Sequence, residues 1–271
     1  MKKIISAALT AMVLVSYARA EQPLPFEDEG VLHQLEGYHH FIVSQRPRRV
    51  EVDETIYRDN GSSIRFMLIP GDCGPTYDDT WDDCANQNER VDLSLTPWTR
   101  HDEEYYTMSL CLDANFRDQH HRDDKSRWAD INLFQFKSAN GINSCFNLFY
   151  NYGFESLAID NRCADGENYN HGERLVRNLS LSRFDYWYDF IFHVRWSNDD
   201  DGFIDLYEGG ERIASFIGPT TIPSDDIVST RPHMFIYRYG IEFYENTSPL
   251  TFWADNVGVY YSLTEVPNRF R

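Results

Sequence analysis

The sequence predicts an all-β fold, a β-jelly-roll sandwich formed by a single domain. The first observation is the stretch from Tyr186 to Gly218, which reads as three strands separated by an acidic turn and a Gly-Gly turn. The second is that short alternating segments recur along the chain, divided by Gly, Asn and Asp. The third is that no window of a dozen residues has a convincing helical period. Two packed antiparallel sheets are therefore expected.

The strand predicted over Tyr186–Trp196 separates its side chains most clearly. Aromatic and β-branched residues occupy every second position, and titratable residues lie between them together with Trp187 and Ile191. This period of two is typical of a strand in a half-buried sheet. We expect the titratable face to form the floor of a ligand groove. Its polar members are Asp189, His193 and Arg195, of which His193 is a candidate substrate-binding residue.

The other strands are predicted from the same alternation, and the polar segment 115–128 is predicted as a loop. In Arg90–Thr96, for example, Val91, Leu93 and Leu95 point inward, whereas Arg90 and Asp92 point outward. The remaining predicted strands are Ser63–Ile69, Glu104–Leu112, Asp130–Lys137, Ser144–Tyr150, Phe154–Asp160, Glu173–Leu181, His233–Tyr239 and Leu250–Ser262.

The first 20 residues have the features of a secretory signal peptide. Lys2 and Lys3 precede an apolar run from Ile4 to Val15, and Ala18-Arg19-Ala20 provides a cleavage site. The apolar run is shorter than the roughly 20 residues that span a bilayer. We expect a secreted or periplasmic protein in which residues 21–45 are a loosely attached lead-in and residues 46–271 form the domain.

The chain is strongly acidic, with 25 Lys and Arg against 43 Asp and Glu and a net charge of −18. Such a field disfavours nucleic acid and anionic membranes as partners. It also opposes a polyanionic ligand unless the binding groove is locally basic. We expect a soluble monomer that binds neither nucleic acid nor membrane.

Five cysteines in an exported chain permit disulfides. Cys73 and Cys84 flank a short acidic loop and are the first predicted pair. Cys145 and Cys163 are the second pair, because they are close along the chain. Cys111 lies within a predicted strand and is expected to be a buried free thiol. The cysteines lack the CxxC spacing of a zinc site.

The acidic turn from Ser197 to Glu208 has oxygen-bearing residues at several positions of a calcium-binding EF-hand loop. The first position is Ser rather than Asp, and the flanking segments alternate as strands rather than helices. A β-hairpin with an acidic tip accounts better for the segment. A structural calcium ion at that tip is left open.

Three further segments, taken in order, resemble the signature strands of a known family. They are Asn88–Leu93, Leu133–Lys137 and Ile236–Glu242. Their order and spacing resemble the R-x-E-L, Q-x-H and K-x-G-x-Y strands of jelly-roll polysaccharide lyases, the heparin lyase I-like and alginate lyase-like group. The resemblance covers about residues 60 to 262. It implies a concanavalin A-like lectin/glucanase/lyase sandwich.

The resemblance also implies β-elimination on an acidic, uronate-containing polysaccharide, with no organic cofactor. The proton on C5 of a uronate is removable only when the neighbouring carboxylate is neutralised. Arg90, Gln135 and Arg238 match the family's neutralising and binding positions. We predict that these three residues and Lys137 converge on one groove.

Two residues depart from the family's pattern. Lys137 stands where the family has His, and Glu242 stands where it has Tyr. We expect Glu242 to pair with Lys137 and raise its pKa, so that Lys137 binds the uronate carboxylate. Proton transfer then falls to Tyr239 or Tyr244. The catalytic candidates are therefore Lys137, Tyr239 and Tyr244.

These departures leave two alternatives open. One is a non-catalytic carbohydrate-binding protein on the same scaffold. The other is a glycosidase that uses Glu242 together with Asp92 or Asp189. A lyase releases products that absorb in the ultraviolet, a glycosidase releases reducing ends without that absorbance, and a binding protein does neither.

Overall fold

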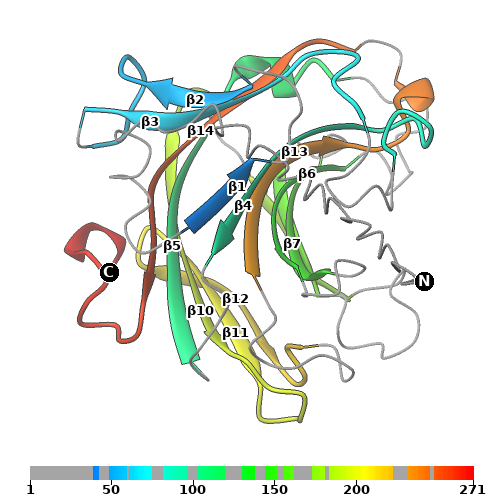
Figure 1. Ribbon diagram of the computed structural model, residues 1–271. Coiled ribbons are helices and arrows are strands. Elements are labelled where there is room, and N and C mark those ends of the chain that lie inside the picture. The colour runs from blue at the N-terminus through cyan, green and yellow to red at the C-terminus, as the bar shows by residue number, and fades with distance from the viewer. Residues whose placement is uncertain are drawn as a thin grey trace, which may run out of the picture.

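The structure is a computed structural model, and it confirms the predicted all-β sandwich (Figure 1). Two seven-stranded antiparallel sheets face each other. No helix in the described part of the chain is long and apolar enough to cross a membrane. The structure describes residues 39–42, 49–59, 61–74, 82–96, 103–119, 130–137, 144–151, 156–161, 173–180, 183–221, 231–244 and 247–271.

Sheet A contains the three segments that resemble the lyase signature. Its strand order is β1 (His39–Ile42), β4 (Glu89–Thr96), β13 (Arg231–Arg238), β6 (Ile131–Lys137), β7 (Ser144–Asn151), β8 (Ser156–Asn161) and β9 (Glu173–Ser180).

Sheet B contains the three-strand stretch that is so regular in the sequence. Its order is β12 (Glu211–Ile217), β11 (Phe203–Glu208), β10 (Trp187–Arg195), β5 (Glu103–Leu112), β14 (Leu250–Tyr260), β3 (Ser63–Leu68) and β2 (Val50–Asp53). Short 3-10 helices occur at η1 (Ala114–Phe116), η5 (Ile241–Phe243) and η6 (Asn268–Phe270).

The predicted strands agree with the observed ones to within about two residues, but β1 and β2 were not predicted. β1 lies in the segment expected to be a lead-in, and it pairs with β4 at the edge of sheet A. β1 (His-His-Phe-Ile) does not alternate, and β2 (Val-Glu-Val-Asp) alternates over only four residues, the shortest run that indicates a strand. The structure does not describe residues 1–20, so the signal peptide stays a prediction. It also leaves out Cys163 and the side chains of Cys145 and Lys137, so the second disulfide stays a prediction.

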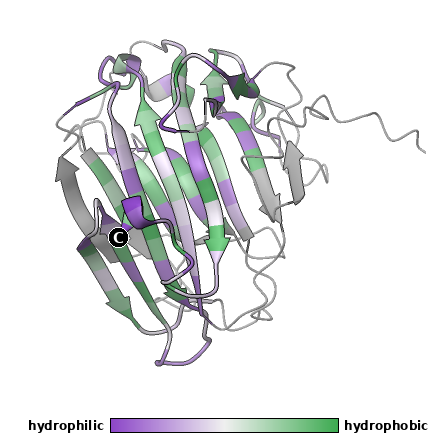
Figure 2. Ribbon diagram, turned by 90° about the vertical axis from the view of Figure 1, so that its left-hand side faces the viewer, coloured by the Kyte–Doolittle hydropathy of each residue, from purple (hydrophilic) through white to green (hydrophobic). Residues whose placement is uncertain are grey.

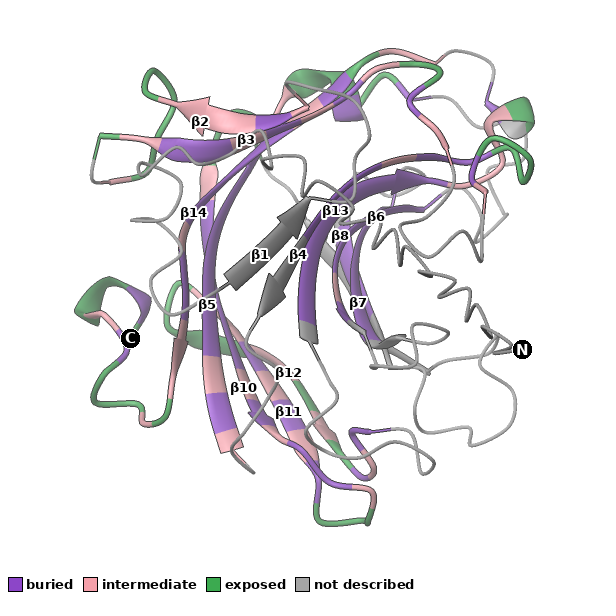
Figure 3. Ribbon diagram, in the orientation of Figure 1, coloured by how far each residue is buried: buried purple, intermediate pink, exposed green. Residues whose placement is uncertain are grey.

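Figure 3 shows that buried residues predominate along the strands of both sheets. The hydrophobic core lies between the sheets and is rich in aromatic side chains. Phe192 on β10 stacks on Phe134 of β6, with ring centroids 5.1 Å apart. Tyr106 on β5 meets the ring of Phe136 edge-on at 4.8 Å. Figure 2 shows the corresponding alternation of hydrophobic and hydrophilic residues along the strands. Each of these contacts joins the two sheets, so the alternation read in the sequence directly places the core.

A bulge in β6 decides which of its residues point away from the core. The register with β7 shifts between Asn132 and Phe134, so Leu133 is the extra residue. Phe134 and Phe136 then pack in the core, whereas Gln135 lies opposite Asn147 of β7. The bulge thereby places Asn132 and Gln135 on the same face of sheet A, the face turned away from sheet B.

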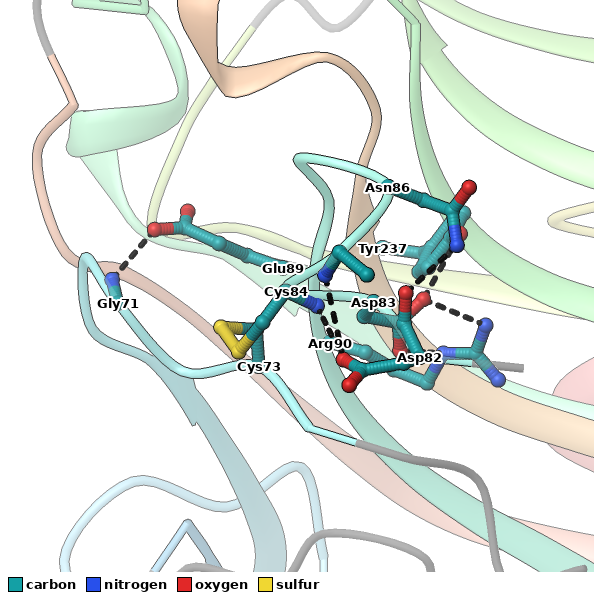
Figure 4. The surroundings of a disulfide bond; sticks show 10 residues. Gly71, Cys73, Asp82, Asp83, Cys84, Asn86, Glu89, Arg90 and Tyr237 are labelled. Atoms are coloured by element: carbon teal, nitrogen blue, oxygen red, sulfur yellow. Dashed lines mark hydrogen bonds and ion pairs between the residues drawn. A yellow bond between two sulfur atoms is a disulfide. The ribbon is translucent and has the colours of Figure 1, made fainter. Parts of the chain in front are cut away.

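The predicted disulfide Cys73–Cys84 is present (Figure 4). Cys111 is a buried free thiol, as expected. Burial raises the pKa of Cys111 to about 12. The hairpin with an acidic tip is also confirmed, and Ser197 Oγ donates to Asp201 across the turn. Among the described residues, no group of three His, Cys, Asp or Glu side chains is arranged to hold a metal ion.

Candidate active site on sheet A

The outer face of sheet A, meaning the face turned away from sheet B, carries a band of polar and aromatic side chains. Sheet A curves so that β13, β6 and β7 make this face concave (Figure 1). On each strand, the residues that alternate with this band belong to the core. The side chains of the band therefore point away from sheet B. Its described members are Arg90 and Asp92 on β4, His233, Phe235 and Tyr237 on β13, Asn132 and Gln135 on β6, and Asn147 and Phe149 on β7.

A histidine and a carboxylate pair at the middle of this face. His233 Nδ1 lies 3.2 Å from Asp92 Oδ1, and the two side chains come from neighbouring strands. They are only 2% and 3% exposed. A buried carboxylate at this distance orients the imidazole ring and favours the tautomer that carries its proton on Nδ1. This arrangement directs the basic character of His233 to Nε2.

Three amide side chains lie beside this pair. His233 is directly opposite Gln135 in the β13–β6 register, and Gln135 is directly opposite Asn147 in the β6–β7 register. The side-chain amides of Asn132 and Asn147 are 3.2 Å apart. Gln135 is partly exposed, whereas both asparagines are buried. The row therefore combines a base with neutral hydrogen-bond donors, the groups that bind a carboxylate without adding charge.

Arg90 lies on the other side of Asp92. Its guanidinium is 3.0 Å from Asp83 and 4.0 Å from Asp92, and it lies over the ring of Tyr237 at 4.4 Å. Burial alone lowers the pKa of Arg90, but the two carboxylates outweigh burial and raise it. Asp92 thus contacts both the imidazole of His233 and the guanidinium of Arg90, and it links these two side chains.

Tyr237 is fixed as a neutral phenol. Burial raises its pKa well above the ordinary range. Its hydroxyl donates to Asp83 at 3.0 Å and accepts from Asn88 Nδ2 at 2.9 Å. Because this hydroxyl both donates and accepts a hydrogen bond within the protein, Tyr237 holds Asp83 and Asn88 in place rather than exchanging a proton with a ligand.

The prediction that Arg238 shares the groove with Arg90 and Gln135 is wrong. Arg238 is fully buried at the end of the sandwich, where its Nε donates to Glu89 at 2.8 Å and its Nη1 donates to Gln119 at 2.6 Å. Its position alternates with Tyr237, so it points to the opposite face of β13. Tyr244, a catalytic candidate, is buried beside it, with the guanidinium 5.6 Å from its ring. Burial raises the pKa of Tyr244 well above the ordinary range.

Three other candidates lie at the ends of these strands. The backbone of Lys137 pairs with Arg231, one row beyond Gln135 and His233. Tyr239 follows β13, and its ring meets that of Tyr237 edge-on at 4.2 Å. Six residues of a strand separate it from His233, a distance of about 20 Å. Glu242 is exposed in η5, which follows β13 beyond Arg238, whereas Lys137 pairs with Arg231 at the other end of β13. The structure therefore brings Glu242 neither to Lys137, with which it was expected to pair, nor to Asp92 in the middle of the face.

The titratable face of β10, expected to form the floor of a ligand groove, does not share a face with Arg90 and Gln135, because β10 belongs to sheet B on the opposite side of the sandwich. His193 there stacks on Tyr105 at 4.0 Å, and its Nε2 lies 2.8 Å from Glu103. Asp189 on the same face forms an ion pair with Arg58 at 3.0 Å. The structure therefore separates His193 and Asp189 from Arg90 and Gln135.

The residues that sequence reasoning missed are His233, Asn132, Asn147 and Asp83. His233 is the first residue of the predicted strand His233–Tyr239, and its alternation with Met234 and Ile236 already indicated that it lies on the face opposite these two apolar residues. Its closeness to Gln135 depends on the cross-strand register, which a single strand does not reveal. The bulge at Leu133 likewise interrupts the alternation of β6, so the sequence does not show that Asn132 lies on the same face as Gln135.

Comparisons with solved structures agree with the fold. A crystal structure of endo-β-1,4-glucuronan lyase from the fungus Trichoderma reesei has a TM-score of 0.62 at 13% identity, covering 86% of this chain and 94% of that one. Alginate lyase AlyC3 has a TM-score of 0.55 at 8% identity, covering 88% and 94%. The alginate lyase from Aplysia kurodai has a TM-score of 0.50 at 10% identity, covering 86% and 93%. At such identities these likenesses show the shared jelly-roll fold.

None of the curated proteins matches the chain. The family model described as polysaccharide lyase, in contrast, matches residues 32–258. That match runs from before β1 into β14 and so includes every strand of sheet A. The chain therefore belongs to the polysaccharide lyase family.

Proposed function

We propose that this polysaccharide lyase is exported and cleaves a linear uronate polymer by β-elimination on the outer face of sheet A. The observation that carries the proposal is the position of His233, beside Gln135 and in contact with Asp92. The histidine that the family's Q-x-H strand supplies is replaced by Lys137, and β13 brings another histidine, His233, opposite Gln135, the first residue of that motif. The similar solved structures include lyases of glucuronan and of alginate, which supports a uronate polymer as the substrate.

The amides beside His233 suit the uronate carboxylate. The C5 proton becomes acidic only when negative charge on the carboxylate is stabilised as the proton leaves. Gln135 and Asn147 occupy facing positions and can donate N–H groups to the two carboxylate oxygens. Lys137, one row further along β6, stays the predicted source of a positive charge for the same group.

His233 serves as the proton-transfer group. With Nδ1–H donating to Asp92, Nε2 takes the proton from C5; the C4–O4 bond breaks and a C4=C5 double bond forms. Where the C5 hydrogen and O4 lie on the same side of the ring, the same imidazolium returns its proton to the departing O4. Tyr239, about 20 Å along the strand, is too far away to act on the same linkage. In this proposal His233, rather than the predicted Tyr239 or Tyr244, transfers the proton.

Arg90 supports this histidine through Asp92. A guanidinium 4.0 Å from Asp92 stabilises the ionised carboxylate, and an ionised carboxylate stabilises the imidazolium that forms during the reaction. Arg90 is already close to two carboxylates, so it carries little uncompensated charge for the polymer. Its role here is to hold Asp92 ionised rather than to bind the substrate carboxylate.

Burial of the pair favours a second candidate, binding of the polymer without cleavage. His233 and Asp92 are almost completely shielded from solvent, so a polymer reaches Nε2 only if this face opens. Gln135 and Arg90 are the partly exposed members of the band. A protein that uses only those exposed groups binds uronate chains but does not process them.

The test compares two histidines that each pair with a carboxylate. His233→Gln removes the base on sheet A, and His193→Gln is the matched control on sheet B, where His193 pairs with Glu103. Both variants and the wild type are incubated with glucuronan and with alginate, and the ultraviolet absorbance of unsaturated uronate is followed. We expect product from the wild type and the control, and at least a hundredfold lower kcat for His233→Gln.

The other possible outcomes distinguish the lyase from a binding protein. Full activity in His233→Gln overturns the assignment of His233. Absence of product from the wild type, together with binding of either polymer in a calorimeter, supports the binding protein. Lys137→Met is predicted to raise KM and leave kcat nearly unchanged, which distinguishes carboxylate binding from proton transfer.

A further inference from the structure

The loop closed by the Cys73–Cys84 disulfide ends directly on the proposed active site. Asp83 precedes Cys84, is 3% exposed and lies 3.0 Å from the guanidinium of Arg90 (Figure 4). The same carboxylate accepts a hydrogen bond from the hydroxyl of Tyr237 at 3.0 Å. One buried carboxylate from the loop therefore contacts two side chains of the outer face of sheet A.

Backbone hydrogen bonds fix the two ends of this loop, residues 72–74 and 82–84, beside the start of β4. Asp83 N–H donates to Gly74 O at 2.9 Å, and Asn88 N–H donates to Asp83 O at 2.8 Å. Arg90 N–H donates to Asp72 O at 2.9 Å, which ties the other arm of the loop to the start of β4. The disulfide joins the two arms, so it restrains the backbone that carries Asp83.

A continuous series of contacts then leads to the proposed base. Asp83 contacts Arg90 at 3.0 Å, Arg90 approaches Asp92 at 4.0 Å, and Asp92 contacts His233 at 3.2 Å. If Asp83 is withdrawn, the guanidinium of Arg90 loses the closer of its two carboxylates and is drawn toward Asp92. A closer ion pair between Arg90 and Asp92 weakens the hold of Asp92 on the imidazole.

We infer that Asp83 is a positioning residue for the lyase reaction and that the Cys73–Cys84 disulfide acts on catalysis through it. Asp83 holds Arg90 over the ring of Tyr237 and so leaves Asp92 available to orient His233. The inference rests on the proposed function of His233. It assigns to the disulfide an effect on kcat, in addition to its effect on stability.

The experiment is a cycle of variants measured well below their melting temperatures. The first variant is Asp83→Asn, the second replaces both Cys73 and Cys84 by Ser, and the third combines the two. Cys111→Ser is the control for loss of a cysteine, since Cys111 is a buried free thiol on sheet B. Asp83→Glu keeps the charge and tests for rescue. We record kcat and KM from ultraviolet absorbance, with melting curves for each protein.

Asp83→Asn and the double Ser variant are each expected to lower kcat about tenfold with little change in KM. Their combination is expected to lower kcat by the same factor as either alone, because both act through one carboxylate. Asp83→Glu is expected to recover most of the loss. A disulfide that only stabilises the fold gives multiplicative losses, or none below the melting temperature, and either result overturns the inference.

The cycle also separates this inference from the proposed function. If His233→Gln keeps full activity, the proposed active site is wrong, and the series of contacts from Asp83 leads to no catalytic residue. If His233→Gln is inactive while folded Asp83→Asn retains full kcat, His233 stands and the positioning role of Asp83 fails.

Discussion

Replacing Arg238 by Met tests whether this residue is structural, as its surroundings indicate. Its guanidinium is fully buried, donates to Glu89 and Gln119, and reaches the backbone carbonyl of Ser248 at 3.2 Å. Glu89 is 1% exposed and also accepts from the backbone N–H of Gly71. Met fills similar space without charge, so the substitution leaves a buried carboxylate without its cation.

The expected loss follows from that uncompensated charge. Removing one partner of a buried ion pair costs about 3–5 kcal/mol, because the other charge stays desolvated. Domains are usually stable by about 5–15 kcal/mol, so the variant loses a large share of its stability. Adding Glu89→Gln to Arg238→Met removes the stranded charge, and the amide oxygen can still accept from Gly71. The double variant is therefore expected to recover about 1–2 kcal/mol.

Urea unfolding followed by tryptophan fluorescence measures these differences. Arg238→Met is expected to lower the midpoint at an unchanged m-value, and KM at low temperature should stay that of the wild type. A loss under about 1 kcal/mol, or a double variant less stable than the single one, refutes the reasoning about the buried pair. A large rise in KM with unchanged stability restores Arg238 as a substrate-binding residue.

Replacing Cys73 and Cys84 by Ser is expected to cost about 2–3 kcal/mol in urea unfolding, since the bond closes a loop with a sequence separation of 11. Cys111 is expected to resist a thiol reagent until the protein unfolds, because it is buried and burial raises its pKa to about 12. Rapid labelling of the native protein contradicts that assignment. Burial raises the pKa of Asp113 to about 6 from 3.8, so the folded state holds this proton more tightly than the unfolded chain. Its contribution to stability is therefore lost as pH rises from 3.8 to about 6, and Asp113→Asn should gain on the order of 1 kcal/mol over the wild type across that range. A constant difference between the two proteins at all pH values contradicts this.

The fold could be predicted because its signal is local. Alternation in β10 separates Phe190, Phe192 and Val194 from His193, and the structure buries the first three between the sheets. Strand partners carry no such local signal. The regularity of β10 suggested a groove at its polar face, yet that face belongs to sheet B. The alternation showed two faces and could not show which sheet carried them.

The candidate site could be predicted only in part for the same reason. Arg90 and Gln135 were placed on one face by motif and parity, and they do share the outer face of sheet A. Arg238 matches a position of the family motif, but it is adjacent to Tyr237 on β13 and so points to the opposite face of the sheet. His233 was missed because its neighbour is Gln135 on another strand, and only the register brings the two together.

The most direct test of the central claim is the mass of the products that the wild-type protein releases from glucuronan and alginate. β-Elimination breaks the C4–O4 bond without adding water, so one of each pair of fragments has an unsaturated uronate at its new end. The account predicts that these unsaturated fragments are lighter by one water than the corresponding hydrolysis fragments, that at least one of the two polymers gives them, and that His233→Gln releases them at least a hundredfold more slowly. Fragments that all have the hydrolytic mass, with none lighter by one water, or eliminated products in equal yield from His233→Gln, contradict it.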